Sequence, residues 1–438
     1  MTPLQATIRA PRFTFRYSKL INFLLFIFIA VGSWTFIEPS PYDIMSLIIV
    51  PVWFLGGFRV HKSAMVLFGL LFVSLLCLFL GAAPHFDQEE PTAHFTHTIY
   101  IYSTAVFFAL FFGEDTEKRV RICLWAYVLS CVVAAAFAVV GYFDLWGSAE
   151  RFAPWGRAQG PFKDPNVFGS YLTLGYLFLL QRFVLGRVKT RFDLVVSGAT
   201  TLYLLLAIFL SFSRGSWGAA ALASFLMTGM AFVTSDDSRM RRRILLVFAI
   251  CLAVGVISVG AILSVDEVRE VFTQRAVGAQ DYDAGETGRF GNQLRSLPLL
   301  VEHPEGLGVL GFRKTFTLDP HQSYIGAFAN GGWAGGLNFL LFVYVTGFVG
   351  FRLCLRRSPY MEDAQVVWTI LLMHFLQAFQ IDIDHWRFFY LQLGVLWGLE
   401  AARQRWEAHG GSLMESQPSE NKALATVGAV PIGRAGGR

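Results

Sequence analysis

Apolar stretches recur along this 438-residue chain from Leu20 to Leu399. Most are about 20 residues long, which is the length of helix that crosses the hydrocarbon core of a bilayer, about 30 Å thick. Between them lie short segments that carry most of the charge and much of the proline. The pattern predicts an all-α, polytopic membrane protein.

The composition argues against a soluble protein. Hydrophobic residues make up 54% of the chain and charged residues only 15%, whereas a soluble domain carries roughly 25% charged residues. The first apolar run, LINFLLFIFIAVGSWTFI, follows basic residues as a signal peptide does, but it is too long and lacks a small-residue cleavage site, so we expect a retained helix. The five cysteines form no CxxC pair, and neither a disulfide nor a cysteine metal site is indicated.

Hydropathy predicts about twelve spans in one domain. They cover residues 20–37, 43–58, 64–82, 98–113, 120–143, 166–184, 194–212, 216–233, 244–264, 324–350, 365–380 and 386–401. Residues 1–19 form a cytoplasmic N-terminal segment in this assignment, residues 20–402 the transmembrane domain, and residues 403–438 a disordered cytoplasmic tail. A long periplasmic loop, residues 265–320, separates the ninth and tenth spans.

The charges between the spans predict the orientation. With the N-terminus in the cytoplasm and the spans alternating, most of the 36 Lys and Arg residues fall in cytoplasmic segments. The opposite side carries acidic loops such as EPSPYD and PHFDQEEPTAH. Because positively charged loops stay on the cytoplasmic side, both termini are expected there.

Several basic residues remain on the periplasmic side, which suggests specific anionic partners. Arg214 is the clearest case, since it is the only formal charge between Leu202 and Phe232 and lies in the short turn SFSRGS. Placing arginine inside a bilayer costs about 2.5–3.5 kcal/mol on insertion scales, so Arg214 is expected to face a cavity, a counter-ion or a ligand. The alternative is that it reaches the outer headgroups and binds lipid phosphate without specificity.

The sequence GRAQGPFKDPNVFGSYL, residues 156–172, leads into the sixth span. The tripeptide at 164–166 is typical of a helix start, and Asn166 is predicted to cap the span. Arg157 and Lys163 would stand just before that start. The alternative interpretation is a loop rich in Gly and Pro whose charges are incidental.

The sequence TGRFGNQLRSLPLLVEHPEGLGVLGF, residues 287–312, belongs to the long periplasmic loop. Its apolar residues recur at helical spacing, which predicts a helix that ends at His303-Pro304. Arg289 and Arg295 flank the start of this helix.

The sequence DPHQSYIGAFANGGWAGG, residues 319–336, follows directly. It places His321 at the membrane surface, where the tenth span begins. A single interfacial histidine is more often structural than catalytic. The glycines at 331, 332, 335 and 336 predict a bent or closely packed helix.

The turn before the last span reads QIDIDHWR. Asp382, Asp384 and His385 carry side chains of types that bind metals. The interpretation we favour is plainer: one of the two aspartates pairs with a nearby arginine and holds it in place. No metal site is therefore expected.

Four of these segments together resemble the O-antigen ligase family, which includes related polysaccharide polymerases. They are RAQGPFKDPNVFGSYL, SFSRGSW, the GRFGNQL…EHPEGLGVLGF block and HQSYIGAFANGGWAGG, and they span residues 157–336 in the family's order. The resemblance implies a GT-C-like, metal-independent glycosyltransferase of the bacterial inner membrane, active on its periplasmic face. It would move a glycan from an undecaprenyl-diphosphate carrier to an acceptor, without a cofactor.

The resemblance also implies roles for residues. The family's pyrophosphate-binding arginines match Arg214 and Arg289, and its histidine matches His321; the Asn that usually follows is Gln322 here. These two arginines and the histidine form the expected catalytic set. The further residues expected at the donor pyrophosphate are Arg157, Lys163 and Arg295, and the expected supporting residues are Asn166, Gln322, Asp384 and Arg387.

The chemistry of these side chains agrees with such a reaction. A diphosphate leaving group gains negative charge as the sugar C1–O bond breaks, and arginines in a low-dielectric cavity stabilise that charge without Mg²⁺. The acceptor hydroxyl needs a base. Neutral His321 is the natural candidate, because imidazole titrates near neutral pH.

The sequence does not identify the acceptor, so two kinds of enzyme remain possible. A ligase would use the lipid A core, and a polymerase would use the growing chain on a second carrier; the motifs favour a ligase slightly, whereas the DIDHWR turn resembles exopolysaccharide members. A transporter or flippase also fits twelve spans, but transporters place charges near the membrane midplane and have repeated halves. Membrane lipids are expected partners, and nucleic acids are not.

Overall fold

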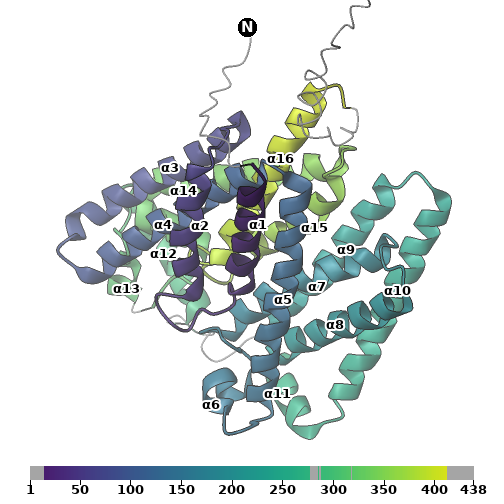
Figure 1. Cartoon of the computed structure of the whole chain (residues 1–438). Helices are drawn as coiled ribbons and strands as arrows, with labels where there is room; N and C mark the ends of the chain where they lie inside the picture. Colours follow the sequence, from purple (N-terminus) through teal and green to yellow (C-terminus); the bar gives the residue numbers. More distant parts are fainter. Residues whose placement is uncertain (1–13, 277–284, 286–287, 317, 412–438) are drawn as a thin grey trace, which may run out of the picture.

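Helices form the regular structure of the part of the chain that the computed structural model describes, residues 14–276, 285, 288–316 and 318–411. In lipid no water pairs the backbone N–H and C=O groups, and a helix pairs them internally. The helices in Figure 1 are α1 (Thr14–Ala30), α2 (Pro41–Leu55), α3 (Lys62–Ala82), α4 (Glu89–Phe112), α5 (Thr116–Tyr142), α6 (Ala149–Phe152), α7 (Pro165–Val184), α8 (Arg191–Leu210), α9 (Arg214–Thr234), α10 (Ser238–Ile262), α11 (Asp266–Ala276), α12 (Arg289–Glu302), α13 (Gly311–Phe316), α14 (Ser323–Leu355), α15 (Met361–Gln377) and α16 (Arg387–Ala408).

The protein is an all-α polytopic membrane protein. Eight helices within the described ranges are long and apolar enough to cross a membrane, namely α3, α4, α5, α7, α8, α9, α10 and α14, and α1 and α2 are apolar but shorter. Each predicted span falls on a helix. In Figure 1 α1 begins and α16 ends on the same side of the bundle, as an even number of crossings requires. The count of twelve stays a prediction.

The connecting and terminal segments differ from simple loops. The predicted periplasmic loop, residues 265–320, contains α11, α12 and α13, and α12 ends at the predicted His303-Pro304. The disordered tail was predicted to begin at residue 403, but α16 extends to Ala408, so residues 403–408 are helical. The remainder of that predicted tail, residues 412–438, and residues 1–13 of the N-terminal segment lie outside the described residues.

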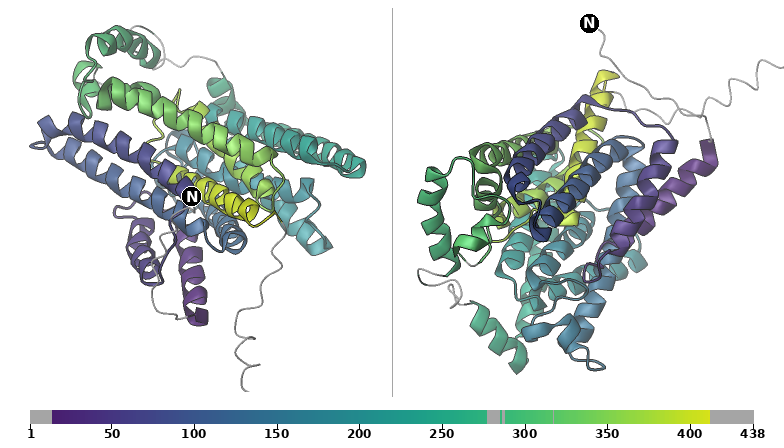
Figure 2. Two further views of the ribbon diagram at one scale, coloured as in Figure 1. Left: turned by 90° about the horizontal axis from the view of Figure 1, so that it is seen from above. Right: turned by 90° about the vertical axis from the view of Figure 1, so that its left-hand side faces the viewer.

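α7 and α16 form the centre of the bundle, because side chains on all their faces are buried. In the view from above (Figure 2, left) α16 lies among the other helices and α10 lies toward the outer edge. α16 packs on α4 through two glycines: a Cβ on Gly394 would lie 2.2 Å from the Cβ of Phe108. A Cβ on Gly398 would lie 2.7 Å from the Cβ of Phe112. Small residues four positions apart let helices approach this closely in lipid.

α14 is interrupted at Gly332, where φ is +64° and ψ is −167°. A Cβ there would lie 2.5 Å from the carbonyl oxygen of Pro304, so the position requires glycine. The N–H of Trp333 donates to the Pro304 carbonyl at 2.9 Å, and the N–H of Leu307 donates to the Ala329 carbonyl at 2.7 Å. The glycine cluster therefore produces the predicted bend, and the bend fastens the segment after α12 to α14.

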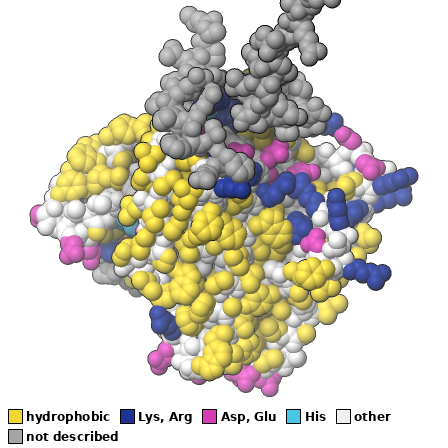
Figure 3. All heavy atoms as spheres, in the orientation of Figure 1, with side chains coloured by type: hydrophobic (Ala, Val, Ile, Leu, Met, Phe, Trp, Pro, Cys, Tyr) yellow, Lys and Arg dark blue, Asp and Glu magenta, His cyan; other side chains and the backbone are white. Residues whose placement is uncertain are grey.

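The surface is apolar over most of the face in Figure 3. Large hydrophobic side chains are exposed on outer helices such as α10, where Ile257 is 70% exposed. Lys and Arg side chains gather in the upper right part of this face, toward the end where α10 begins. α10 starts with Arg239, Arg241, Arg242 and Arg243. This asymmetry is the one that the predicted orientation requires at the cytoplasmic side.

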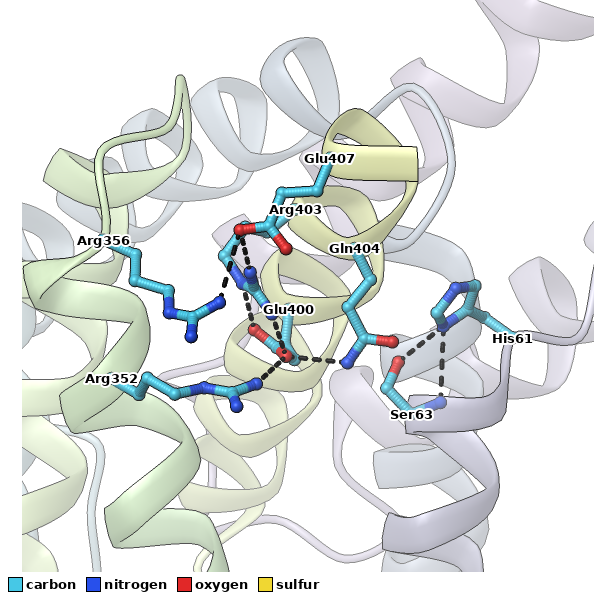
Figure 4. A network of polar contacts seen from close by, with 8 residues as sticks. All are labelled: His61, Ser63, Arg352, Arg356, Glu400, Arg403, Gln404 and Glu407. Carbon is cyan, nitrogen blue, oxygen red and sulfur yellow. Dashed lines mark hydrogen bonds and ion pairs between the residues drawn. The ribbon is translucent and has the colours of Figure 1, made fainter. Parts of the chain in front are cut away.

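A buried ion-pair network joins α14 to α16 (Figure 4) at the end that is predicted to be cytoplasmic. Glu400 is 1% exposed and accepts hydrogen bonds from Arg403 at 2.7 Å and from Arg352 at 3.1 Å. The side-chain amide of Gln404 donates a further bond at 2.7 Å. Arg403 also pairs with Glu407. A charge buried this deeply is tolerated only because it is paired and hydrogen-bonded.

Replacing Glu400 with alanine should destabilise the bundle strongly. The change leaves the buried Arg403 without its main counter-ion, and breaking one side of a buried pair costs about 3–5 kcal/mol. The comparison variant is Glu407→Ala: its side chain is 41% exposed and Arg403 keeps Glu400 as its main counter-ion, so the loss of stability should be clearly smaller. Unfolding midpoints of the purified proteins in detergent measure both effects. Equal losses in the two variants would contradict this account.

Candidate functional site

Five of the predicted site residues line one polar cavity of about 140 Å³. The cavity lies where the first residues of α7, α9 and α12 meet the segments before α14 and after α15. The five residues are Arg157, Asn166, Arg214, Arg289 and His321. All four segments that resemble the O-antigen ligase family therefore contribute to one cavity, although these five residues are spread over more than 160 positions of the chain.

A tight turn brings Arg214 to this cavity. After α8 ends, Phe212 adopts a left-handed conformation with φ of 47°. Ser213 then caps α9, because its side chain accepts a hydrogen bond from the N–H of Ser216. Arg214 is the first residue of α9 and is exposed. Its charge thus belongs to a helix start at the cavity rather than to the middle of a span.

Arg157 is fixed by two hydrogen bonds at the start of α7. Its Nε donates to the carbonyl oxygen of Ser211 at 3.0 Å, and its Nη2 donates to Oδ1 of Asn166 at 3.0 Å. The helix cap is Asp164, which accepts from the N–H groups of Asn166 and Val167. The prediction that Asn166 caps the helix was therefore wrong. Asp164 stands one residue before the helix, where a cap is needed, which leaves the Asn166 side chain to orient the arginine.

Three helix starts converge on the cavity, and this makes it attractive to anions. Arg289 is the first residue of α12, and its Nη1 lies 3.5 Å from the carbonyl oxygen of Gln380. The starts of α7 and α9 lie at the same cavity. A helix N-terminus carries a partial positive charge of roughly half an elementary charge and presents N–H groups. Helix ends and guanidinium groups therefore act in the same direction.

His321 stands between this cavity and the α15–α16 connection. Its φ is 48°, and its Nδ1 lies 3.9 Å from Oδ2 of Asp382. Burial and the positive charge of Arg289 lower the pKa of the His321 imidazole below its usual value. The ring is therefore neutral near pH 7, as a proton acceptor has to be.

The carboxyl group beside His321 is unusual. Burial, together with the neighbouring charges of Asp384 and Asp319, raises the pKa of Asp382 to about 8. A carboxyl group in such surroundings holds a proton near neutral pH, because desolvation and like charges both disfavour its ionised form. Asp382 therefore faces His321 mainly as a neutral group.

Arg275 also lines the polar cavity of about 140 Å³, which is called the arginine cavity below, and it was not among the predicted site residues. It lies on α11, a helix of the predicted periplasmic loop. The only sequence signal was its position as a basic residue on the side that the orientation rule leaves poor in positive charge. That signal is shared by several residues of the same loop, so it could not single out Arg275.

Three predicted residues have other surroundings. Lys163 forms an ion pair with Glu38. Arg295 donates a hydrogen bond of 2.6 Å to Oδ1 of Asn292 within α12. Gln322 lies 3.5 Å from a backbone carbonyl oxygen after α15. None of the three lines the arginine cavity.

The QIDIDHWR turn is arranged differently from the prediction. Arg387 forms a bidentate pair with Asp43 of α2, with both N–O distances at 2.9 Å, so this arginine is not held by an aspartate of its own turn. Asp384 lines a second cavity of about 220 Å³ together with His385 and His94. His94 comes from α4, and nothing in the sequence connects it with a turn almost 300 residues later.

An apolar groove of about 790 Å³ adjoins the arginine cavity. α12 and α14 form it, and its side chains include Leu294, Leu297, Phe328 and Trp333. Its lining includes Phe290 and Gln322, which directly follow Arg289 and His321 in the sequence. A charged end and an apolar tail of one ligand could therefore be bound side by side.

Comparison with known proteins agrees with the sequence resemblance. Residues 199–340 match the model of the family described as O-antigen ligase. This range contains Arg214, Arg289 and His321, whereas Arg157 lies outside it. The chain is also 33% identical over 156 residues to an O-antigen polymerase of Salmonella muenchen. That similarity covers 35% of this chain and 35% of the Salmonella protein.

Proposed function

We propose that this member of the O-antigen ligase and polymerase family is a glycosyltransferase that uses an undecaprenyl-diphosphate-linked glycan as donor. The observation that carries the proposal is the cavity in which four arginines and three helix starts meet beside His321. Guanidinium groups bind phosphate oxygens in pairs, and helix N-termini attract anions. A diphosphate satisfies both kinds of group, and on the predicted orientation it would do so at the periplasmic face of the bacterial inner membrane.

The apolar groove supports a lipid-linked donor over a soluble one. Its exposed wall residues on α12 include Leu294 and Val301, which are 70% and 65% exposed. A polyprenyl chain would cover such side chains, and burying apolar area contributes about 25 cal/mol per Å². The diphosphate would then enter the arginine cavity from the Phe290 end of the groove.

The reaction needs two events at the anomeric carbon. The bond from C1 to the diphosphate oxygen breaks while a bond forms between C1 and the acceptor oxygen. Arg214 and Arg289 stabilise the departing undecaprenyl diphosphate as its negative charge grows. The acceptor hydroxyl gives its proton to the neutral imidazole of His321. The arginines perform the role that Mg²⁺ has in other diphosphate chemistry, so no metal is needed in this proposal.

The acceptor separates two versions of the function. We favour transfer to the lipid A core, since the family match and the four motifs point to an O-antigen ligase. The second candidate is a polymerase that extends repeat units on a second carrier. It is favoured by the name of the similar Salmonella protein and by the DIDHWR turn, which resembles exopolysaccharide members.

A transfer assay without any ion gradient tests the proposal. Purified protein in detergent is incubated with an undecaprenyl-diphosphate glycan and either lipid A core or a second molecule of the donor. We expect free undecaprenyl diphosphate and a product on one acceptor, and the acceptor that is used decides between ligase and polymerase. Absence of product on both, combined with glycan movement across proteoliposomes, would replace the proposal with transport.

Transfer should persist in EDTA, because the proposed stabilising charges are covalent parts of the chain. The measurement is the initial rate of undecaprenyl diphosphate release before and after chelation, at a temperature where the protein stays folded. We expect most of the rate to remain. A complete loss that Mn²⁺ or Mg²⁺ restores would move the catalytic role to a metal and would overturn this part of the proposal.

A further inference from the structure

The second cavity contains a group of metal-binding side chains that the proposed function does not use. His94 on α4 and Asp384 and His385 between α15 and α16 each offer one ligand atom, and these atoms all lie within 4.8 Å of one another. All three side chains line the cavity of about 220 Å³, and all are half-buried. The donors are two imidazole nitrogens and one carboxylate oxygen, from two segments that are far apart in the sequence.

Further side chains lie against this group: Oγ1 of Thr98 is 3.3 Å from Nε2 of His385, and His97 lies beside the same ring. The rings of His94 and His97 have their centroids 4.4 Å and 4.9 Å from that of His385. Nε2 of His97 is buried without a hydrogen-bond partner among the described residues. Arg387, three residues after Asp384, forms its bidentate pair with Asp43 of α2, and Arg313, which lines the same cavity, pairs with Asp319.

We propose that His94, Asp384 and His385 bind one divalent transition-metal ion, with Zn²⁺ as the best match. Zn²⁺ takes histidine nitrogen and carboxylate oxygen ligands at about 2.0–2.2 Å, which places tetrahedral ligand atoms about 3.3 Å apart. Three protein ligands leave the fourth position for water from the cavity. Mg²⁺ and Ca²⁺ fit less well, because they prefer oxygen ligands alone.

The metal would join α4 to the turn that adjoins His321. The turn carries Asp382, which lies 3.9 Å from Nδ1 of His321, and its backbone is held by the Tyr390 hydroxyl, which donates to the carbonyl oxygen of Asp384 at 2.7 Å. A ligand set that connects α4 with this turn fixes the wall between the two cavities. The ion therefore stabilises the fold near the site and takes no part in bond breaking.

Metal analysis of the full-length protein tests the inference. The protein is purified without chelator or metal-affinity resin, equilibrated with Zn²⁺, freed of excess ion and measured by mass spectrometry for bound zinc. We expect one zinc per chain in the wild type and in the control His303→Ala, since the His303 side chain is 45% exposed, pairs with Glu305 and lies outside the cavity of the three ligands. His94→Ala and His385→Ala should lose it. Equal zinc in all four proteins, or none in the wild type, would overturn the proposal.

If a variant is unstable, the absorption spectrum of the Co²⁺-substituted protein and the effect of EDTA on the unfolding temperature still test the site. Co²⁺ in place of Zn²⁺ should give the visible absorption of a four-coordinate site, and the conservative change Asp384→Asn should shift or abolish it. EDTA should lower the unfolding temperature of the wild type but not of His385→Ala. An identical effect of EDTA on both would contradict the site. These readouts involve no glycan, so their failure is distinct from a failure of the proposed transferase activity.

Discussion

Replacing Arg214 with alanine should abolish detectable glycan transfer while the protein remains in the membrane. The side chain is exposed at the start of α9, where it contributes to the cavity rather than to the core. Removing one preorganised group that stabilises developing charge typically costs roughly 10²–10³-fold in rate. Arg289→Ala should have an effect of the same size, because Arg289 occupies the equivalent position on α12.

Two further variants separate geometry from charge. Arg214→Lys should also be severely impaired, since an ammonium group cannot contact two phosphate oxygens as a planar guanidinium does. Arg269→Ala is the control: Arg269 is a basic residue of α11 that pairs with Asp266 and lies outside the arginine cavity. Transfer rates are compared at equal amounts of membrane-inserted protein. Near-normal transfer by both Arg214→Ala and Arg289→Ala would show that the pyrophosphate is bound elsewhere.

Replacing His321 with alanine should lower turnover by roughly 10²–10⁴-fold, the usual contribution of a general base. Donor affinity should change little, because the diphosphate contacts are assigned to the arginines. His321→Gln distinguishes a base from an orienting group, since glutamine keeps a hydrogen-bonding side chain but cannot take up a proton. Turnover and donor affinity are measured for both variants. Lost donor affinity with unchanged turnover would make His321 a diphosphate contact instead.

The same residue should set the acid limit of the reaction. A base has to be unprotonated, and the pKa of His321 lies below its usual value because of burial and Arg289. The rate should therefore hold through pH 7 and fall only as the pH drops below the ordinary imidazole pKa of about 6.5. The charged and titratable groups that act on His321 are Asp382, Arg289, Asp319, Asp164 and Arg313. A rate that falls on raising the pH through neutrality would contradict the base role.

The positions of the helices could be predicted because lipid imposes a simple rule on sequence. A chain that crosses a bilayer places most of its charged residues near helix ends, and the Pro, Gly and charges between the apolar runs mark those ends. Arg214 could be identified because it is the only charge in a short turn between two apolar spans, whereas the role of Arg289 was implied by the resemblance to the family. The four clustered glycines predicted a bent or closely packed helix, and the structure places the bend at Gly332.

Long-range partners could not be predicted. The Arg387–Asp43 pair joins residues 344 positions apart, and His94 reaches Asp384 only through the packing of α4 on α16. Sequence spacing records periodicity within one helix, whereas side chains from different helices meet according to how the helices are rotated and crossed. Asp164 was overlooked for a local reason, because Asp164 and Asn166, on either side of Pro165, both suit a helix cap and only the backbone geometry decides between them.

The apolar groove between α12 and α14 has a consequence for how concentration should be understood in this system. If the polyprenyl chain lies in that groove, the donor reaches the arginines sideways, without leaving the leaflet, and the spent carrier departs by the same route. The quantity that governs the rate is then the mole fraction of donor among the lipids, not its amount per volume of buffer. Adding inert lipid or detergent would slow the enzyme by diluting the donor within the surface, even when the amounts of enzyme and donor per volume are unchanged.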